Sequence, residues 1–486
     1  MEVRTGRIAD EDRHATSPFQ ASHSMNAREV RHDGGVASPM AISVAPTEDD
    51  PFVAAHAESV GGEVGIRSQR SWGRAAAFMV GIIGAALVFS AGIVMRAPCA
   101  ASGFEDNTAF VKLCYSDIGK LYTTRGLDKG YFPYASRTDG TPYVEYPVLQ
   151  GLLMWAPTVV VGTQGPLMDR TVRYYAISSV ALFALLLLAL WATIATSPRR
   201  PWDSVILAVA PSIALVGTLN WDLLPVALLA LAVLAWTREQ PWISGVLIGL
   251  GTAAKVYPGF LLLVLIVVAL RTKQWSGTWR AAAGAAGAWS LVNLPVAWLF
   301  PTGWGEFYRL SSQRTYDFGS LWIALRFLGF PIDRWPASLV ASGTFVVALI
   351  AIAWLVWRAP VTPRIGSLLF LVVAAFCLTN KVYSPQYALW LLPLIVLARP
   401  RWRDVLIWQA GEAIYYMGVW LWLHHFSDDR NSLADQPYAL LIMVHVAVTL
   451  YLVVLVVRDV LHPDRDPVRR SNHGSDPLSG DLVGAR

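Results

Sequence analysis

Several acidic residues follow the first apolar run of the chain, and four of them are candidates for a base, because a carboxylate there can accept a proton from a substrate hydroxyl and make its oxygen a nucleophile. We take Asp117, about twenty residues beyond that run, as the candidate base. Asp128 and Asp139 compete with it, although we prefer to interpret both as solvated loop charges. Glu145 directly precedes Tyr146 and a proline, where a helix N-terminal charge and a substrate contact are equally good interpretations of the glutamate. Tyr146 is a further candidate for a substrate contact.

Two lysines stand out because the chain has only six, and Lys255 and Lys381 occupy very short turns between apolar runs. A lysine in such a turn can present a compact cation to a phosphate. The alternative is that each side chain only extends its ammonium to the membrane interface. Asp222 lies in a comparable turn, as a substrate contact or simply as a polar turn residue.

Several other polar residues lie at the ends of apolar runs or inside them, and they are weaker candidates for substrate contacts. Glu412 is in the middle of an apolar run, where burying a carboxylate in the membrane costs free energy. Such a residue is a candidate functional residue, and the alternative is a hydrogen bond to a neighbouring helix. The chain has no His-x-x-x-His pattern, no cysteine cluster and no glycine-rich phosphate loop, so we predict no metal site and no ATP-driven pump. The weaker candidates are Arg309, Tyr383, Gln386, Glu412 and His424.

The positions of the three cysteines bear on which side of the membrane the first loop lies. Cys99 and Cys114 are fifteen residues apart just after the first apolar run, whereas Cys377 lies inside a later one. If the segment after the first run is extracytoplasmic, Cys99 and Cys114 can form a disulfide. Two unrelated free thiols are the less favoured alternative.

The composition identifies the kind of protein that must position these residues. Of the 486 residues, 55 % are hydrophobic and 15 % are charged, against about 25 % charged in soluble proteins. Apolar runs long enough to cross a bilayer recur from residue 74 to residue 457. The sequence therefore predicts an all-α polytopic membrane protein. Its net charge of +5 needs no nucleic acid as partner, because cytoplasmic loops and anionic lipids account for it.

The distribution of arginines sets the topology. If residues 146–163 form an interfacial helix, the arginine-rich loops all fall inside, together with both termini. Residues 96–170 are then one long external loop, and residues 300–320 form another. We expect about twelve spans: 74–95, 171–196, 203–219, 221–236, 242–257, 258–270, 281–299, 336–357, 365–379, 384–398, 404–424 and 437–457.

The two ends of the chain differ from the membrane domain, residues 71–457. Residues 1–70 and 458–486 are polar and show no period typical of a helix or a strand, so we expect disordered cytoplasmic tails. Because the first apolar run begins after residue 70, we expect an uncleaved anchor and no cleavable signal peptide.

The order of these features resembles the GT-C class of membrane glycosyltransferases, and more closely glycosyltransferase family 87 of actinobacteria. A long external loop carrying an Asp is followed by a helix that opens with Tyr-Pro and then by many spans. No single motif is specific, but together they cover nearly the whole membrane domain. They are SDIGKLYTTRGL (116–127), VEYPVLQGLL (144–153), NWDLLPVALLALA (220–232), GLGTAAKVYPGFLLLVL (249–265) and NKVYSPQYALWLLPLIVLARP (380–400).

The resemblance implies an inverting transfer of a sugar from a polyprenyl phosphate to a lipid or glycan acceptor at the external face of the plasma membrane. The acid of the first external loop, which corresponds to Asp117, would be the base. Lys255 and Lys381 would face the donor phosphate, with Arg309 and His424 behind them. No cofactor is implied, and no divalent metal is expected. Mannose is the favoured sugar and arabinofuranose the alternative.

Other function classes fit parts of the pattern. Twelve spans with both ends inside are also typical of transporters, but the halves show no internal repeat and the first external loop is unusually long. A flippase for a lipid-linked sugar would bind the same lipid without needing a base. A catalytically silent scaffold of the cell envelope is the third possibility. Replacing Asp117 by Asn separates these classes, because only a transferase should lose turnover.

Overall fold

The structure, a computed structural model, describes residues 73–105, 109–137, 139–427, 431–472 and 474–478, in which all regular structure is helical. Five of its helices are long and apolar enough to cross a membrane, and shorter apolar helices lie between them. The chain is therefore a polytopic membrane protein, as predicted. The number of spans, about twelve, stays a prediction, and the tail predicted over residues 1–70 lies outside the described residues.

The helices follow the predicted apolar runs closely. The α-helices are α3 (Arg74–Ala100), α4 (Asp117–Thr124), α5 (Val148–Val161), α6 (Leu167–Thr196), α7 (Val205–Val209), α8 (Pro211–Val216), α9 (Leu223–Thr237), α10 (Pro241–Ala254), α11 (Phe260–Thr272), α12 (Ser276–Leu299), α13 (Pro301–Gln313), α14 (Leu321–Phe327), α15 (Ala337–Arg358), α16 (Ile365–Thr379), α17 (Ala388–Ala398), α18 (Trp402–His424), α19 (Asp435–Leu461) and α20 (Pro467–Ser471). Short 3-10 turns are η2 (Leu127–Lys129), η3 (Pro201–Ser204), η4 (Tyr257–Gly259), η5 (Ile332–Arg334), η6 (Pro385–Tyr387) and η7 (Pro463–Arg465).

Two predicted segments differ in the structure. The expected span 203–219 is broken into α7 and α8, because Pro211 has no N–H to continue a helix and Ala210 before it is extended (φ −65°, ψ 130°). Residues 300–320, expected to be a loop, contain the helix α13. The apolar pattern alone predicts neither the helix break at Ala210 nor the helix α13.

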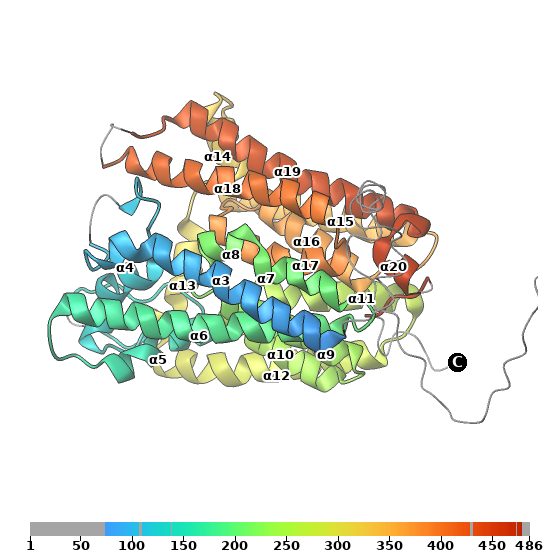
Figure 1. The fold of residues 1–486 in the computed structure, drawn as a ribbon, viewed down its shortest axis with the longest axis horizontal. Helices are drawn as coiled ribbons and strands as arrows, with labels where there is room; N and C mark the ends of the chain where they lie inside the picture. Colours follow the sequence, from blue (N-terminus) through green and yellow to red (C-terminus); the bar gives the residue numbers. More distant parts are fainter. Residues whose placement is uncertain (1–72, 106–108, 138, 428–430, 473, 479–486) are drawn as a thin grey trace, which may run out of the picture. The chain divides into compact units, whose positions relative to one another are not determined.

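Small residues let neighbouring helices approach closely. Gly245 and Gly249 of α10 face Ala281 and Ala285 of α12, and a Cβ at either glycine would lie 2.2–2.3 Å from the facing carbonyl oxygen. This spacing of small residues is the one that membrane helices use to bring their backbones together. Helices α18 and α19 also pack side by side (Figure 1).

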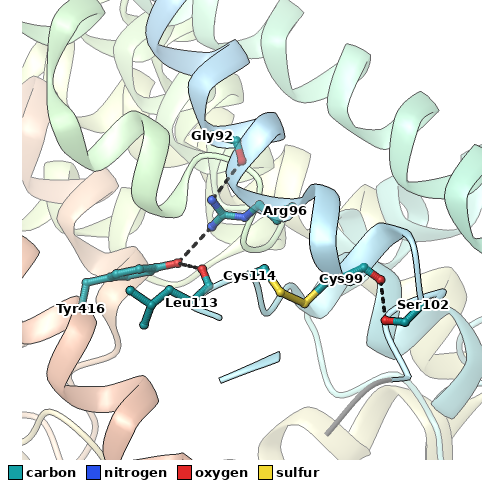
Figure 2. Close-up of a disulfide and its surroundings, with 7 residues drawn as sticks. All are labelled: Gly92, Arg96, Cys99, Ser102, Leu113, Cys114 and Tyr416. Carbon is teal, nitrogen blue, oxygen red and sulfur yellow. Dashed lines mark hydrogen bonds between the residues drawn. A yellow bond between two sulfur atoms is a disulfide. The ribbon is translucent and has the colours of Figure 1, made fainter. Parts of the chain in front are cut away.

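The end of α3 is tied to three other segments (Figure 2). A disulfide joins Cys99 of α3 to Cys114. One turn earlier, the buried Arg96 donates to the Ala214 carbonyl of α8 (2.8 Å), to the Leu215 carbonyl and to the Tyr416 hydroxyl of α18 (3.5 Å). Tyr416 in turn donates to the Leu113 carbonyl (3.0 Å). The disulfide and Arg96 therefore hold the start of the first loop against α8 and α18.

Residues 458–472 and 474–478 of the C-terminal tail are folded, which corrects the expectation of disorder for this part of residues 458–486. Asp466 caps α20 and pairs with the buried Arg364 (2.6 Å), which also donates to the carbonyls at the end of α17. Leu478 is buried as well, and Asp476 accepts from the Ile365 N–H (3.0 Å). Burying the charge of Arg364 without compensation would be costly, and Asp466 of the tail supplies the opposite charge.

Candidate functional site

Asp117 is the first residue of α4, and its position is set by the turn that precedes α9. The Ser116 hydroxyl caps α4 by accepting from the Ile118 N–H (3.2 Å) and donates to the Thr218 carbonyl (2.7 Å). The Asp117 N–H donates to the Leu219 carbonyl (2.8 Å). These contacts place the carboxylate beside the turn that carries Asp222, 105 residues later in the chain.

Burial raises the pKa of the Asp117 carboxyl from 3.8 to about 6. The Tyr115 hydroxyl and the Lys255 ammonium oppose this rise, whereas the charges of Glu145 and Asp222 add to it. The side chain is only half-buried, so a substrate can reach it. A carboxylate with this pKa is a stronger base than an ordinary Asp and is still mostly ionised at pH 7.

Lys255 and Asp222 form an ion pair with Nζ and Oδ1 2.9 Å apart. Asp222 is completely buried, whereas the Lys255 side chain is 15 % exposed. The Lys255 ammonium also lies 4.8 Å from the centre of the Tyr146 ring, and the Tyr146 hydroxyl lies 3.5 Å from Asp117 Oδ2. Lys255 therefore contacts both the buried Asp222, which fixes the position of the lysine, and Tyr146, which bonds Asp117. A substrate contact by Asp222 stays a prediction.

Aromatic residues of η4, η6 and α17 complete this group. The Trp390 indole donates to Asp222 Oδ2 (2.9 Å), and its ring is stacked between Tyr257 (4.4 Å between ring centres) and Tyr387 (3.7 Å). Gln150 of α5 is at 3.5 Å from Asp222 Oδ1. Trp390, Tyr387 and Gln150 were not among the predicted site residues, because aromatic and amide side chains in an apolar run give no separate signal.

Glu145 has a role that the sequence did not suggest. Its two carboxylate oxygens accept from the Arg125 guanidinium at 2.5 and 2.6 Å, in a bidentate pair. The helix α5 begins only at Val148, so Glu145 is not part of its first turn. Because Arg125 neutralises Glu145, Asp117 is the better base of the two.

Lys381 lies in the turn between α16 and η6. Its ammonium donates to the Ser311 carbonyl and to the Ser338 hydroxyl, both at 2.6 Å. Burial and the nearby Arg314 lower the pKa of Lys381. Among the residues that the structure describes, no carboxylate lies within ion-pair distance of this ammonium, and an anionic ligand would compensate its charge.

The remaining predicted contacts lie in other environments. Glu412 bonds His445 Nδ1 (2.9 Å) between α18 and α19, and the Tyr383 ring packs on His445 (3.9 Å), so this pair supports helix packing. Arg309 is exposed and pairs with Glu306 on α13 (2.6 Å). His424 is buried at the end of α18, and its Nδ1 has no hydrogen-bond partner within the described ranges. Gln386 is half-buried beside Tyr387.

The site thus combines a base of raised pKa with a nearby cation, which suits the activation of a hydroxyl next to a phosphate leaving group. No group of three His, Cys, Asp or Glu side chains that could hold a metal occurs in the described part of the chain.

Two comparisons bear on this site. Residues 143–380 match the family model of glycosyltransferase family 87. The matched segment contains Tyr146, Asp222 and Lys255, whereas Asp117 and Trp390 lie outside it. The comparison with curated proteins finds no match.

Proposed function

Because the chain belongs to glycosyltransferase family 87, we propose that it moves a sugar, with mannose favoured, from a polyprenyl phosphate to a glycolipid or polysaccharide of the cell envelope. The reaction would take place at the extracytoplasmic face of the plasma membrane, with both termini in the cytoplasm. The observation that carries the proposal is that Asp117, at the start of α4, and Lys255, at the end of α10, both lie against Tyr146.

In the proposed reaction, Asp117 removes the proton from an acceptor hydroxyl. The acceptor oxygen attacks the anomeric carbon from the side opposite the phosphate, so the configuration at that carbon inverts. The new carbon–oxygen bond forms as the bond from the anomeric carbon to the phosphate oxygen breaks, and the electron pair leaves with the polyprenyl phosphate. The proton stays on Asp117 until solvent removes it.

Lys255 has the chemistry to stabilise the leaving phosphate, because its cation is fixed by the buried Asp222 and Trp390 before the substrate arrives. Such fixed charges act without reorganising during the reaction. The donor is a phosphate diester, and its cleavage releases the polyprenyl phosphate as a phosphate monoester with a second pKa of about 6. Because this leaving group is a weakly basic anion, the mechanism calls for no strong general acid, cofactor or metal.

Sugar transfer by the purified protein in nanodiscs tests the proposal. Radiolabelled polyprenyl-phosphate mannose and the corresponding arabinofuranose donor would be supplied separately, with cell-envelope lipids and glycans as acceptors. Product from the mannose donor supports the proposal as stated. Product from the arabinofuranose donor alone would show that the transferred sugar is arabinofuranose and not mannose. If neither gives product but the protein moves donor between the leaflets of liposomes, the chain is a flippase and the proposal is wrong.

A further inference from the structure

A buried pair of titratable side chains, Glu412 of α18 and His445 of α19, takes no part in the proposed reaction. His445 Nδ1 lies 2.9 Å from Glu412 Oε1, and the two side chains are 0 % and 3 % exposed. Nε2 of His445 has no hydrogen-bond partner among the described residues. Because ionisable groups inside a membrane domain are costly, such a pair needs an explanation beyond the packing of two helices.

Two tyrosines connect the His445 ring to the turn that carries Lys381. The ring centres of Tyr383 and Tyr415 lie 3.9 and 4.1 Å from that of His445. The Tyr415 hydroxyl donates to the Tyr383 carbonyl (3.1 Å). The Tyr383 hydroxyl bonds Thr449 (3.1 Å), one turn beyond His445 on α19. Tyr383, two residues after Lys381, is therefore held at its ring, at its hydroxyl and at its carbonyl.

The segment before α14 holds the same turn from another side. The Asp317 N–H donates to the Lys381 carbonyl (2.8 Å), and the Tyr383 N–H donates to the Phe318 carbonyl (3.3 Å). A Cβ at Gly319, where φ is +77°, would lie 1.9 Å from the Tyr383 carbonyl oxygen. The two segments thus pack backbone against backbone, and the turn cannot move far unless its aromatic contacts with α18 and α19 loosen.

We propose that Glu412 and His445 are positioning residues, which act through Tyr383 to fix Lys381 where its ammonium meets the donor phosphate. The inference rests on the proposed function, because that reaction supplies the phosphate. A cation fixed in advance binds an anion without the cost of being ordered at that moment. Both members of the pair are buried and act only through the turn, so their effect on binding should vanish once Lys381 is removed.

The reactivity of Lys381, which is only 9 % exposed, tests the positioning directly. The chain has six lysines, and peptide mass spectrometry can follow the acetylation of each by N-hydroxysuccinimide acetate. His445→Asn still offers Glu412 a donor but has no ring, whereas Tyr415→Phe keeps its ring and the buried pair but loses the hydroxyl. We expect Lys381 to react about tenfold faster in His445→Asn and about two- to tenfold faster in Tyr415→Phe. The exposed Lys129 is the internal reference and should not change.

Tyr451→Phe is the matched control. The Tyr451 hydroxyl of α19 donates to Asp404 of α18 (2.8 Å), about two helical turns from Glu412, so its loss weakens the same helix pair elsewhere. We expect Lys381 to react in this variant as in the wild type. If His445→Asn and Tyr415→Phe also leave the reactivity of Lys381 unchanged, with or without a lower Tm, the proposal is overturned and the pair only packs α18 against α19.

Binding of polyprenyl phosphate to the protein in nanodiscs, measured by native mass spectrometry, gives a second readout. We expect His445→Asn to weaken binding up to about tenfold, and to weaken it no further when Lys381→Met is already present. Equal losses in both backgrounds, or binding that Lys381→Met leaves unchanged, overturn the proposal. If the wild type neither transfers sugar nor binds polyprenyl phosphate, the proposed function fails, while the acetylation rates still decide whether the pair holds Lys381 in place.

Discussion

The raised pKa of Asp117 predicts a specific pH dependence of the transfer reaction. The base acts only when ionised, so kcat/KM should rise with pH through a pKa of about 6 and level off above pH 7. The ionised fraction is about 0.9 at pH 7 and about 0.1 at pH 5, which predicts a roughly tenfold fall between these values. An ordinary Asp, with a pKa of 3.8, would leave the rate almost unchanged over this range.

The same shift has an opposite consequence for stability. Because the folded protein binds the Asp117 proton more tightly than the unfolded chain does, ionisation costs folding free energy as the pH rises from 3.8 to about 6. The difference between these pKa values corresponds to at most about 3 kcal/mol, less the screening that a partly exposed carboxyl receives from solvent. Asp117→Asn removes this cost, so it should unfold a few degrees higher at pH 7 while losing about 10²–10⁴ in kcat.

The assay is transfer at limiting donor from pH 5 to pH 8, with thermal unfolding of the wild type and Asp117→Asn in the same detergent. The Tm advantage of the variant should be present at pH 7.5 and shrink toward pH 4. A flat rate profile between pH 5 and pH 7, together with a variant that unfolds earlier than the wild type, would refute the reasoning. Asp117 would then be a structural carboxylate.

Three other predictions follow from buried contacts. Lys255→Gln should raise KM for the donor and move the acidic limb of the rate profile to higher pH, because the ammonium lowers the pKa of the base; the pH dependence of kcat/KM measures both. Asp466→Asn should cost about 3–5 kcal/mol of stability by leaving a buried arginine unpaired, whereas Asp464→Asn at an exposed site should cost little; denaturant unfolding compares the two. Gly249→Leu should force α10 and α12 apart and abolish a monodisperse peak in size-exclusion chromatography, whereas Gly287→Leu, which meets nothing within 4 Å at its Cβ, should not.

The sequence predicts the helices well because each membrane helix needs a long run of apolar residues, which is easily recognised. The run 365–379 is α16 to the residue, and most other predicted spans differ from the structure by a few residues at each end. The apolar pattern does not predict the break at Ala210, because Pro211 in an apolar run is compatible with either a kinked helix or two separate helices. The pattern also does not predict the folded segment around Asp466, because Arg364, which pairs with Asp466, lies 102 residues away in the chain.

The site is predicted less completely. Unusual residues in short turns, such as Lys255 and Asp222, can be noticed in a sequence, and the structure joins these two in one ion pair. Whether such a residue touches a ligand or supports another residue depends on burial, and complete burial makes Asp222 a support. Trp390 could not be found, because its contact with Asp222 spans 168 residues and a tryptophan in a span is usually a packing or interface residue.

The measurement that tests the central claim most directly is single-turnover sugar transfer by the wild type and Asp117→Asn in identical nanodiscs, with donor binding measured on the same samples. We predict that the wild type releases one polyprenyl phosphate for each sugar transferred, and that the variant binds donor with similar affinity but forms product about 10²–10⁴ times more slowly. Product from the variant at the rate of the wild type would contradict the assignment of the base and, with it, the mechanism.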